Sequence, residues 1–166
     1  LEFPNGERRT YSRMKARGLG AVIIVPMLDA TTVLLAREYA AGLHHYEIGL
    51  PKGRLERGES ILEAAQREMK EDIGYGARQL QGLTRLSLAP AYMTHMTHIV
   101  LARDLYPEKL EGDEPEEIEV VPWPMADIHA LTARADCTEG RSIAALYIAR
   151  DYLAAEAVRV DAASRG

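Results

Sequence analysis

The chain has 166 residues, 47% of them hydrophobic, which is enough to bury the core of one small domain without disulfides. Its net charge of −5 excludes the broad basic surface of proteins that coat nucleic acid, and no apolar run is long enough to span a membrane. The single cysteine, Cys137, cannot form an internal disulfide, which favours a reducing compartment, and we expect a cytoplasmic protein.

The first third of the chain predicts extended structure. Asn5-Gly6 separates two short segments, a pattern typical of a two-residue hairpin turn. Three further segments have the apolar runs of strands: 21–27, 32–38 and 46–50. We expect the first two at the centre of a sheet. The last enters Pro51-Lys52-Gly53, a turn whose glycine lets the backbone pass close to another group.

A helix is predicted to follow, beginning near Gly58 or Ser60 and ending at Gly74. Four apolar residues recur at helical spacing and are expected to hold it against the core: Leu62, Ala65, Met69 and Ile73. This stripe gives the opposite flank of the helix a fixed direction.

The flank of this helix carries three carboxylates. Glu68, Glu71 and Asp72 fall on neighbouring faces, because residues three and four apart lie over one another. A solvated helix face is the ordinary interpretation of such a run. Crowded like charges are also relieved by a bound cation, and three oxygen donors suit a hard ion such as Mg²⁺.

The second half of the chain alternates strand and helix patterns. Strands are predicted at 82–88, 98–105 and 118–123, and helices at 125–131 and 141–158. The acidic stretch 111–119 is interrupted by Gly112 and Pro115 and is predicted to be a loop; a merely solvated connection is the alternative. We therefore expect an α/β (α+β) protein with a mixed sheet flanked by helices.

The acidic helix and the turn before it resemble the Nudix box. Eight residues stand at its offsets: Gly53, Glu59, Arg67, Glu68, Met69, Glu71, Asp72 and Gly74. Two positions depart from the pattern, because Asp72 replaces a glutamate and Tyr75 an aliphatic residue. The shorter aspartate still offers oxygen ligands, so the first departure affects geometry more than function.

The resemblance extends through residues 85–92 and 99–116 to Nudix hydrolases of ADP compounds. It implies the Nudix α/β/α sandwich over 20–166, preceded by an N-terminal antiparallel hairpin over 1–19 that packs on a partner subunit in a homodimer. It also implies Mg²⁺-dependent cleavage of ADP-ribose, diadenosine polyphosphates and NADH, with AMP and ribose 5-phosphate as the products from ADP-ribose. Mn²⁺ is a possible substitute ion.

The resemblance further implies roles for individual residues. The metal ligands are Glu68, Glu71, Asp72, Glu116 and the backbone carbonyl of Lys52. The catalytic set is Glu114 as general base, Glu71, and Arg67, which holds a carboxylate in place; Glu117 can displace either loop residue. Gly53, Glu59 and Gly74 support the motif. These positions follow from the family pattern carried onto this sequence.

Substrate contacts are expected from the end of one strand and from two other positions. The candidates are Arg37, Glu38, Tyr39, Glu47 and Tyr92, although a strand-edge charge pair is an equally good interpretation of the first two. His95 and His98 are too few and too isolated for zinc. Two alternatives stay open: a Nudix hydrolase of another nucleoside diphosphate derivative, and a non-catalytic module that binds nucleotide.

Overall fold

The structure is a computed structural model that describes residues 1–15, 18–112 and 115–164. The strands are β1 (Ala21–Pro26), β2 (Thr32–Ala40), β3 (His45–Gly49), β4 (Lys52–Arg54), β5 (Tyr75–Ser87), β6 (Met96–Pro107) and β7 (Glu119–Pro124). The helices are α1 (Ile61–Asp72), the 3₁₀ helix η1 (Met125–Asp127), α2 (Ile128–Thr132) and α3 (Gly140–Ser164).

The strands form two sheets. One is mixed and has the order β4-β1-β6-β5, with β1 parallel to β6 and the outer pairs antiparallel. The other is antiparallel and has the order β3-β2-β7. The prediction that 21–27 and 32–38 form central strands is confirmed, because β1 and β2 each have a neighbour on both sides. The expectation of one sheet was incomplete.

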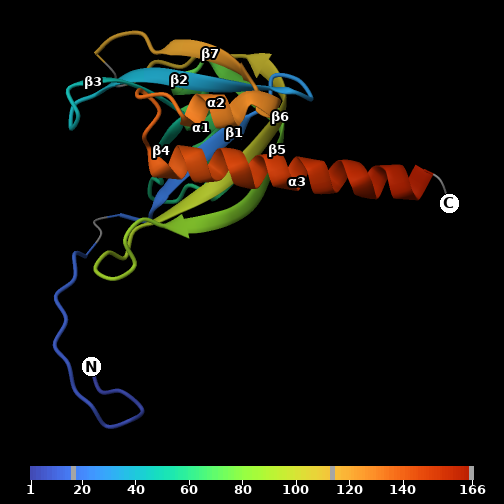
Figure 1. Cartoon of the computed structure of the whole chain (residues 1–166). Helices are drawn as coiled ribbons and strands as arrows, with labels where there is room; N and C mark the ends of the chain where they lie inside the picture. The colour runs from blue at the N-terminus through green and yellow to red at the C-terminus, as the bar shows by residue number, and fades with distance from the viewer. Residues whose placement is uncertain (16–17, 113–114, 165–166) are drawn as a thin grey trace.

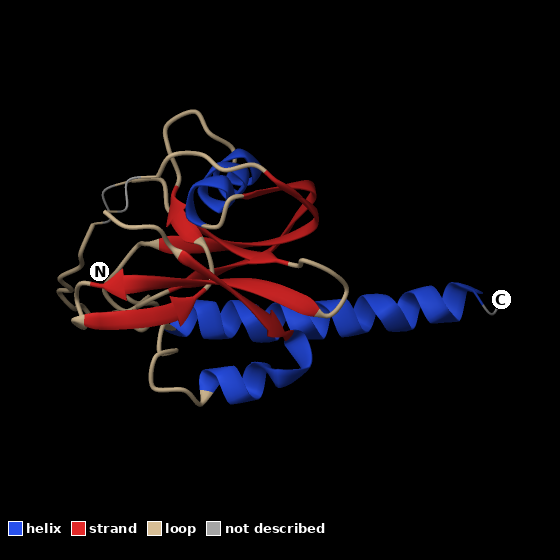
Figure 2. Cartoon of the chain, turned by 90° about the horizontal axis from the view of Figure 1, so that it is seen from above, coloured by secondary structure: helices blue, strands red, loops and turns tan. Residues whose placement is uncertain are grey.

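Helices cover the sheets from both sides, as Figures 1 and 2 show for α1 on one side and for α2 and α3 on the other. The alternation of β1 explains why. Ile23 and Val25 pack into a core cluster with α2 and α3, whereas Val22 and Ile24 pack into a second cluster with α1. The α/β/α sandwich is therefore built by strands that are apolar on both faces.

Helix α1 begins and ends as the sequence predicts. Ser60 is its N-cap and forms a capping box with Glu63, since each side chain accepts the other's backbone N–H. Gly74 follows the C-cap with a φ of 74°. The predicted apolar stripe is wrong at one position: Leu62 is 41% exposed, and Ala64 is buried in its place.

Some element bounds differ from the prediction. The turn predicted at Pro51-Lys52-Gly53 is instead largely taken up by the short strand β4, Lys52–Arg54, which is antiparallel to β1. The predicted helix 125–131 divides into η1 and α2, and α3 continues to Ser164. Within the described ranges, no helix is long and apolar enough to cross a membrane.

The N-terminal hairpin is confirmed only as a small feature. Glu2 and Arg8 form one isolated antiparallel bridge, and the N–H of Gly6 donates to the carbonyl of Phe3 across the predicted turn. Residues 1–15 lie away from the strands (Figure 1) and return to the body through a bridge between Met14 and Met93. The segment after the turn does not form the predicted strand.

Candidate active site

Arg67 is the centre of an ion-pair network on α1. Its Nη1 donates to Glu68 at 2.8 Å and to Glu71 at 2.9 Å, and its Nε donates to Glu59 at 2.9 Å. Its Nη2 also donates to the backbone carbonyl of Arg54. The hydrogen bonds to Glu59, and secondarily those to Glu68, raise the pKa of Arg67 further above its ordinary value, so the guanidinium stays charged.

This network fixes the orientation of the acidic flank. Glu59, Glu68 and Glu71 come from two turns of α1 and the loop before it, yet all three converge on one guanidinium. Arg67 was expected to hold a carboxylate in place, and Glu71, one turn away on α1, is one of the carboxylates that it contacts. The supporting role expected of Glu59 matches its contact, because the hydrogen bond from Arg67 lowers the pKa of this carboxyl.

Glu68 lies directly against the backbone of Gly53. A Cβ built on this glycine would stand 1.8 Å from the carboxylate carbon of Glu68, which no real side chain permits. Burial raises the pKa of Glu68, while the contacts with Arg67 act in the opposite direction. The box glycine is therefore explained by a carboxylate that occupies the space of its missing side chain.

Asp72 is buried, and it contacts the backbone of β4 at Lys52, the residue before Gly53. Its Oδ2 accepts the backbone N–H of Lys52 at 3.0 Å. The hydroxyl of Ser142, at the start of α3, accepts the N–H of Leu50 at 3.0 Å. The chain on either side of Pro51 is thus held by two buried side chains, and the carbonyl of Lys52 has a fixed place.

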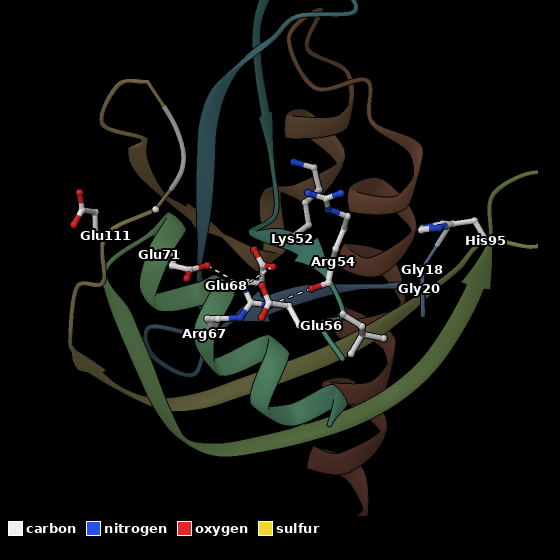
Figure 3. Close-up of a pocket in the computed structure, with 13 residues that line it drawn as sticks. Gly18, Gly20, Lys52, Arg54, Glu56, Arg67, Glu68, Glu71, His95 and Glu111 are labelled. Carbon is white, nitrogen blue, oxygen red and sulfur yellow. Dashed lines mark hydrogen bonds and ion pairs between the residues drawn. The ribbon is translucent and has the colours of Figure 1, made fainter. Parts of the chain in front are cut away.

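A cavity of about 620 Å³ opens beside these groups (Figure 3). Its acidic lining residues are Glu56, Glu68, Glu71 and Glu111, and its basic ones are Lys52, Arg54, Arg67 and His95. Asp72 is not among the lining residues. Of the predicted site residues, the structure therefore brings Lys52, Gly53, Arg67, Glu68 and Glu71 together around one space.

The acidic loop after β6 lies next to this cavity. Glu71 and Glu111 also line a neighbouring pocket of about 370 Å³, together with Glu116 and Glu117. The carboxylate of Glu116 accepts a hydrogen bond of 2.7 Å from the Tyr46 hydroxyl of β3. That bond raises the pKa of Tyr46. The expected general base, Glu114, lies outside the described residues.

The predicted substrate residues of β2 are engaged with other side chains. Arg37 pairs with Glu119 across the β2–β7 ladder and lies over the Tyr46 ring at 4.6 Å. The carboxylate of Glu38 accepts a hydrogen bond of 2.5 Å from the ammonium of Lys52. The alternative of a strand-edge charge pair is wrong in two respects: β2 is the central strand of its sheet, and Arg37 and Glu38 each pair with a residue of another strand. Through Lys52, Glu38 is linked to the cavity lining.

Three other predicted substrate residues lie outside the cavity lining. Burial alone would raise the pKa of Glu47, but hydrogen bonds from His45 and Thr138 lower it overall. The two bonds from Thr138 tie the carboxylate to the chain before α3. Tyr39 is exposed and packs edge-on against a neighbouring ring. Tyr92 is exposed on the β5–β6 loop.

The donor set fits a divalent ion in chemistry and in burial. Glu68, Glu71 and Asp72 supply carboxylate oxygens, and the Glu68 contact with Gly53 brings the β4 backbone close to them. In the described ranges, no group of three or more His, Cys, Asp or Glu side chains is already placed to hold a metal ion. Arg67 bonds one oxygen of each glutamate, Oε1 of Glu68 and Oε2 of Glu71, so the other oxygen of each carboxylate is not used by this arginine.

Sequence reasoning missed five residues of this region. Arg54, Glu56, His95 and Glu111 line the cavity, and Tyr46 holds Glu116. A usable signal existed for Arg54, since side chains two apart on a strand share a face with Lys52. The positions of His95 and Tyr46 depend on contacts between segments far apart in sequence, which no local pattern contains.

Comparison with known proteins identifies the family in which these site residues occur. The NUDIX domain family matches residues 18–143. The chain is 48% identical to the ADP compounds hydrolase NudE of Escherichia coli over 92% of this chain and 82% of that protein. It is 28% identical to an ADP-ribose pyrophosphatase of Bacillus subtilis over 88% of this chain and 79% of the relative.

A solved structure has the same architecture. A crystal structure of an ADP compounds hydrolase superimposes with a TM-score of 0.83 at 47% sequence identity, covering 94% of this chain and 84% of that one. The fold expected from the resemblance is therefore confirmed.

Proposed function

The chain belongs to the Nudix hydrolase family, and from that premise we propose that it hydrolyses ADP-linked diphosphates in a divalent-metal-dependent reaction. The proposed substrates are ADP-ribose, diadenosine polyphosphates and NADH. One observation carries the proposal: the carboxylates of Glu68 and Glu71 border a cavity at the box glycine, held in place by Arg67. The names of the relatives support the choice of ADP compounds.

For ADP-ribose, the proposed reaction breaks one phosphorus–oxygen bond. Water attacks a phosphorus atom of the diphosphate, the bridging oxygen leaves with the other phosphate, and the products are AMP and ribose 5-phosphate. The charge on the diphosphate repels a nucleophile, so the site needs neutralising cations and a base. We place the base in the acidic loop at Glu114, with Glu117 as the alternative.

The proposed metal ion is Mg²⁺, with Mn²⁺ as a possible substitute. Glu68, Glu71, Asp72 and the carbonyl of Lys52 would hold it, and Glu116 is the additional ligand expected from the loop. When bound, the ion would neutralise negative charge on the phosphate oxygens. Arg67 keeps the two glutamates together in its absence, which offsets their mutual repulsion.

We also propose a homodimer to which residues 1–19 contribute. The supporting observation is that Tyr11, Met14 and Leu19 are 60 to 61% exposed although they are apolar or aromatic. Light scattering of the purified chain tests the dimer directly. A monomer at micromolar concentration contradicts it.

The test of activity is a substrate panel in Mg²⁺, with AMP release followed by chromatography. Glu68→Gln should lower the rate by at least about 100-fold, because it removes a charge that stabilises bound metal. Glu63→Gln is the matched control, since glutamine retains the capping box and the residue lies on α1 outside the cavity.

The outcomes separate the alternatives. If ADP-ribose stays intact while a sugar nucleotide or capped RNA is cleaved, the substrate class is wrong. If no compound is cleaved and nucleotides still bind, the chain is a non-catalytic module. Equal loss of activity in the Glu63 and Glu68 variants would remove the special role of the acidic flank.

A further inference from the structure

The cavity beside α1 is lined by negative charges that would repel an anionic ligand. Four of its lining residues are glutamates, and a diphosphate that enters it brings further negative charge. A bound metal ion would meet the phosphate from the side of Glu68 and Glu71. The opposite side of the ligand needs a cationic side chain that is available for it.

Two of the cations in the lining already have carboxylate partners. Arg67 bonds Glu59, Glu68 and Glu71, and the ammonium of Lys52 pairs with Glu38. Arg54 differs from both. In the part of the chain that the structure describes, its guanidinium makes no hydrogen bond or ion pair, so it is the one lining arginine or lysine there without a carboxylate partner.

The backbone of Arg54 is nevertheless firmly placed. The residue pairs with Ala21 in the β4–β1 ladder, and its carbonyl accepts Nη2 of Arg67 at 3.0 Å. The backbone of its neighbour Gly53 lies against the Glu68 carboxylate. Arg54 and Lys52 project to the same side of β4, away from Glu71 (Figure 3).

From this placement we infer that Arg54 binds a phosphate oxygen of the diphosphate substrate. A guanidinium presents two parallel N–H donors that match phosphate, and an arginine already paired with a carboxylate would have to give up that pair first. The inference rests on the proposed function for its substrate class. It assigns ground-state binding to Arg54, so its removal should affect KM more than kcat.

The experiment compares Arg54→Leu and Arg54→Lys with the wild-type chain. Arg57→Leu is the matched control, because Arg57 is also exposed but does not line the cavity. For each protein, kcat and KM are measured with ADP-ribose and Mg²⁺. The dissociation constant of ADP with Mg²⁺ is measured separately by calorimetry, and thermal unfolding confirms that each variant is folded.

Arg54→Leu should raise both KM and the ADP dissociation constant about tenfold, which corresponds to about 1.4 kcal/mol for one charged hydrogen bond, and kcat should change less than about threefold. Arg54→Lys should weaken ADP binding less than Arg54→Leu, because lysine restores the positive charge but not the two parallel N–H donors of the guanidinium. Arg57→Leu should match the wild type. Raising the salt concentration should reduce the difference in ADP dissociation constant between the wild type and Arg54→Leu, because salt screens the attraction between the guanidinium and the phosphate.

Two results overturn the inference. One is unchanged ADP affinity and KM in Arg54→Leu, and the other is an equal loss in Arg57→Leu, which would show a general effect of surface charge. Failure of the proposed function has a different signature: the wild-type chain leaves ADP-ribose intact. The calorimetric comparison with ADP still reports on Arg54 in that case.

Discussion

The carboxylate of Glu68 occupies the space that a side chain at position 53 would need. The distance from a Cβ at Gly53 to the carboxylate carbon would be 1.8 Å. The glycine is required here by a neighbouring side chain, since its φ is not in the left-handed region. This makes the contact testable without confusion from backbone strain.

Gly53→Ala should therefore displace Glu68 and lower the hydrolysis rate by about 100-fold or more, because small displacements of catalytic groups have effects of that size. The measurement is kcat with ADP-ribose in Mg²⁺. Gly140→Ala is the control, since nothing lies within 4 Å of its added Cβ. An alanine variant at position 53 with full activity would show that the position of Glu68 is unimportant.

Asp72 has a structural contact and a proposed metal-binding role, and two variants separate them. Asp72→Ala leaves the Lys52 N–H without its acceptor and should lower the free energy of unfolding by about 1–3 kcal/mol. Asp72→Asn retains an acceptor and should lose less stability. Both should lose Mg²⁺ affinity in calorimetry if the carboxylate is a ligand. Normal Mg²⁺ uptake by Asp72→Asn would leave only the structural role.

Glu59 should make stability depend on pH. The hydrogen bond from Arg67 lowers the pKa of Glu59 in the folded state below the ordinary glutamate value of 4.5, so the folded form binds fewer protons than the unfolded form just below pH 4.5. The contribution is thus present above pH 4.5 and is lost as the pH falls through the folded-state pKa. Glu59→Gln should lower the free energy of unfolding by about 2 kcal/mol at neutral pH, and urea titrations should show the difference shrinking in acid.

Tyr46 should report on the position of Glu116. The hydrogen bond to this carboxylate raises the pKa of the phenol, so Glu116→Gln should move one tyrosine ionisation to lower pH in an absorbance titration. Tyr46→Phe should remove that same ionisation. Tyr39→Phe serves as the comparison, because its hydroxyl has no contact with Glu116. An unchanged titration of Glu116→Gln would mean that the contact does not persist in solution.

Local features of the site could be predicted from the sequence. The ends of α1 depend on Ser60, Glu63 and Gly74, which act within a few residues, and the box fixes the spacing of the carboxylates. The apolar stripe was predicted less well. Ala64 is buried and Leu62 exposed, because the side of α1 that meets the sheet is set by close packing of small residues.

Contacts between distant segments could not be predicted. Proline and glycine are typical of turns, so the sequence predicts a turn at Pro51-Lys52-Gly53, but pairing with β1 makes Lys52–Arg54 a strand. The division into two sheets likewise depends on which strands meet. The bond between Tyr46 and Glu116 joins residues 70 positions apart, and nothing in either local sequence indicates it.

The contact between Gly53 and Glu68 joins two elements, β4 and α1, to which different roles are proposed. The carboxylates proposed for the ion come from α1, whereas the cations Lys52 and Arg54 come from β4, and the two elements touch where the glycine has no side chain. Substitution of Lys52 or Arg54 should therefore change the binding of an anionic ligand while the proposed ion ligands on α1 keep their positions.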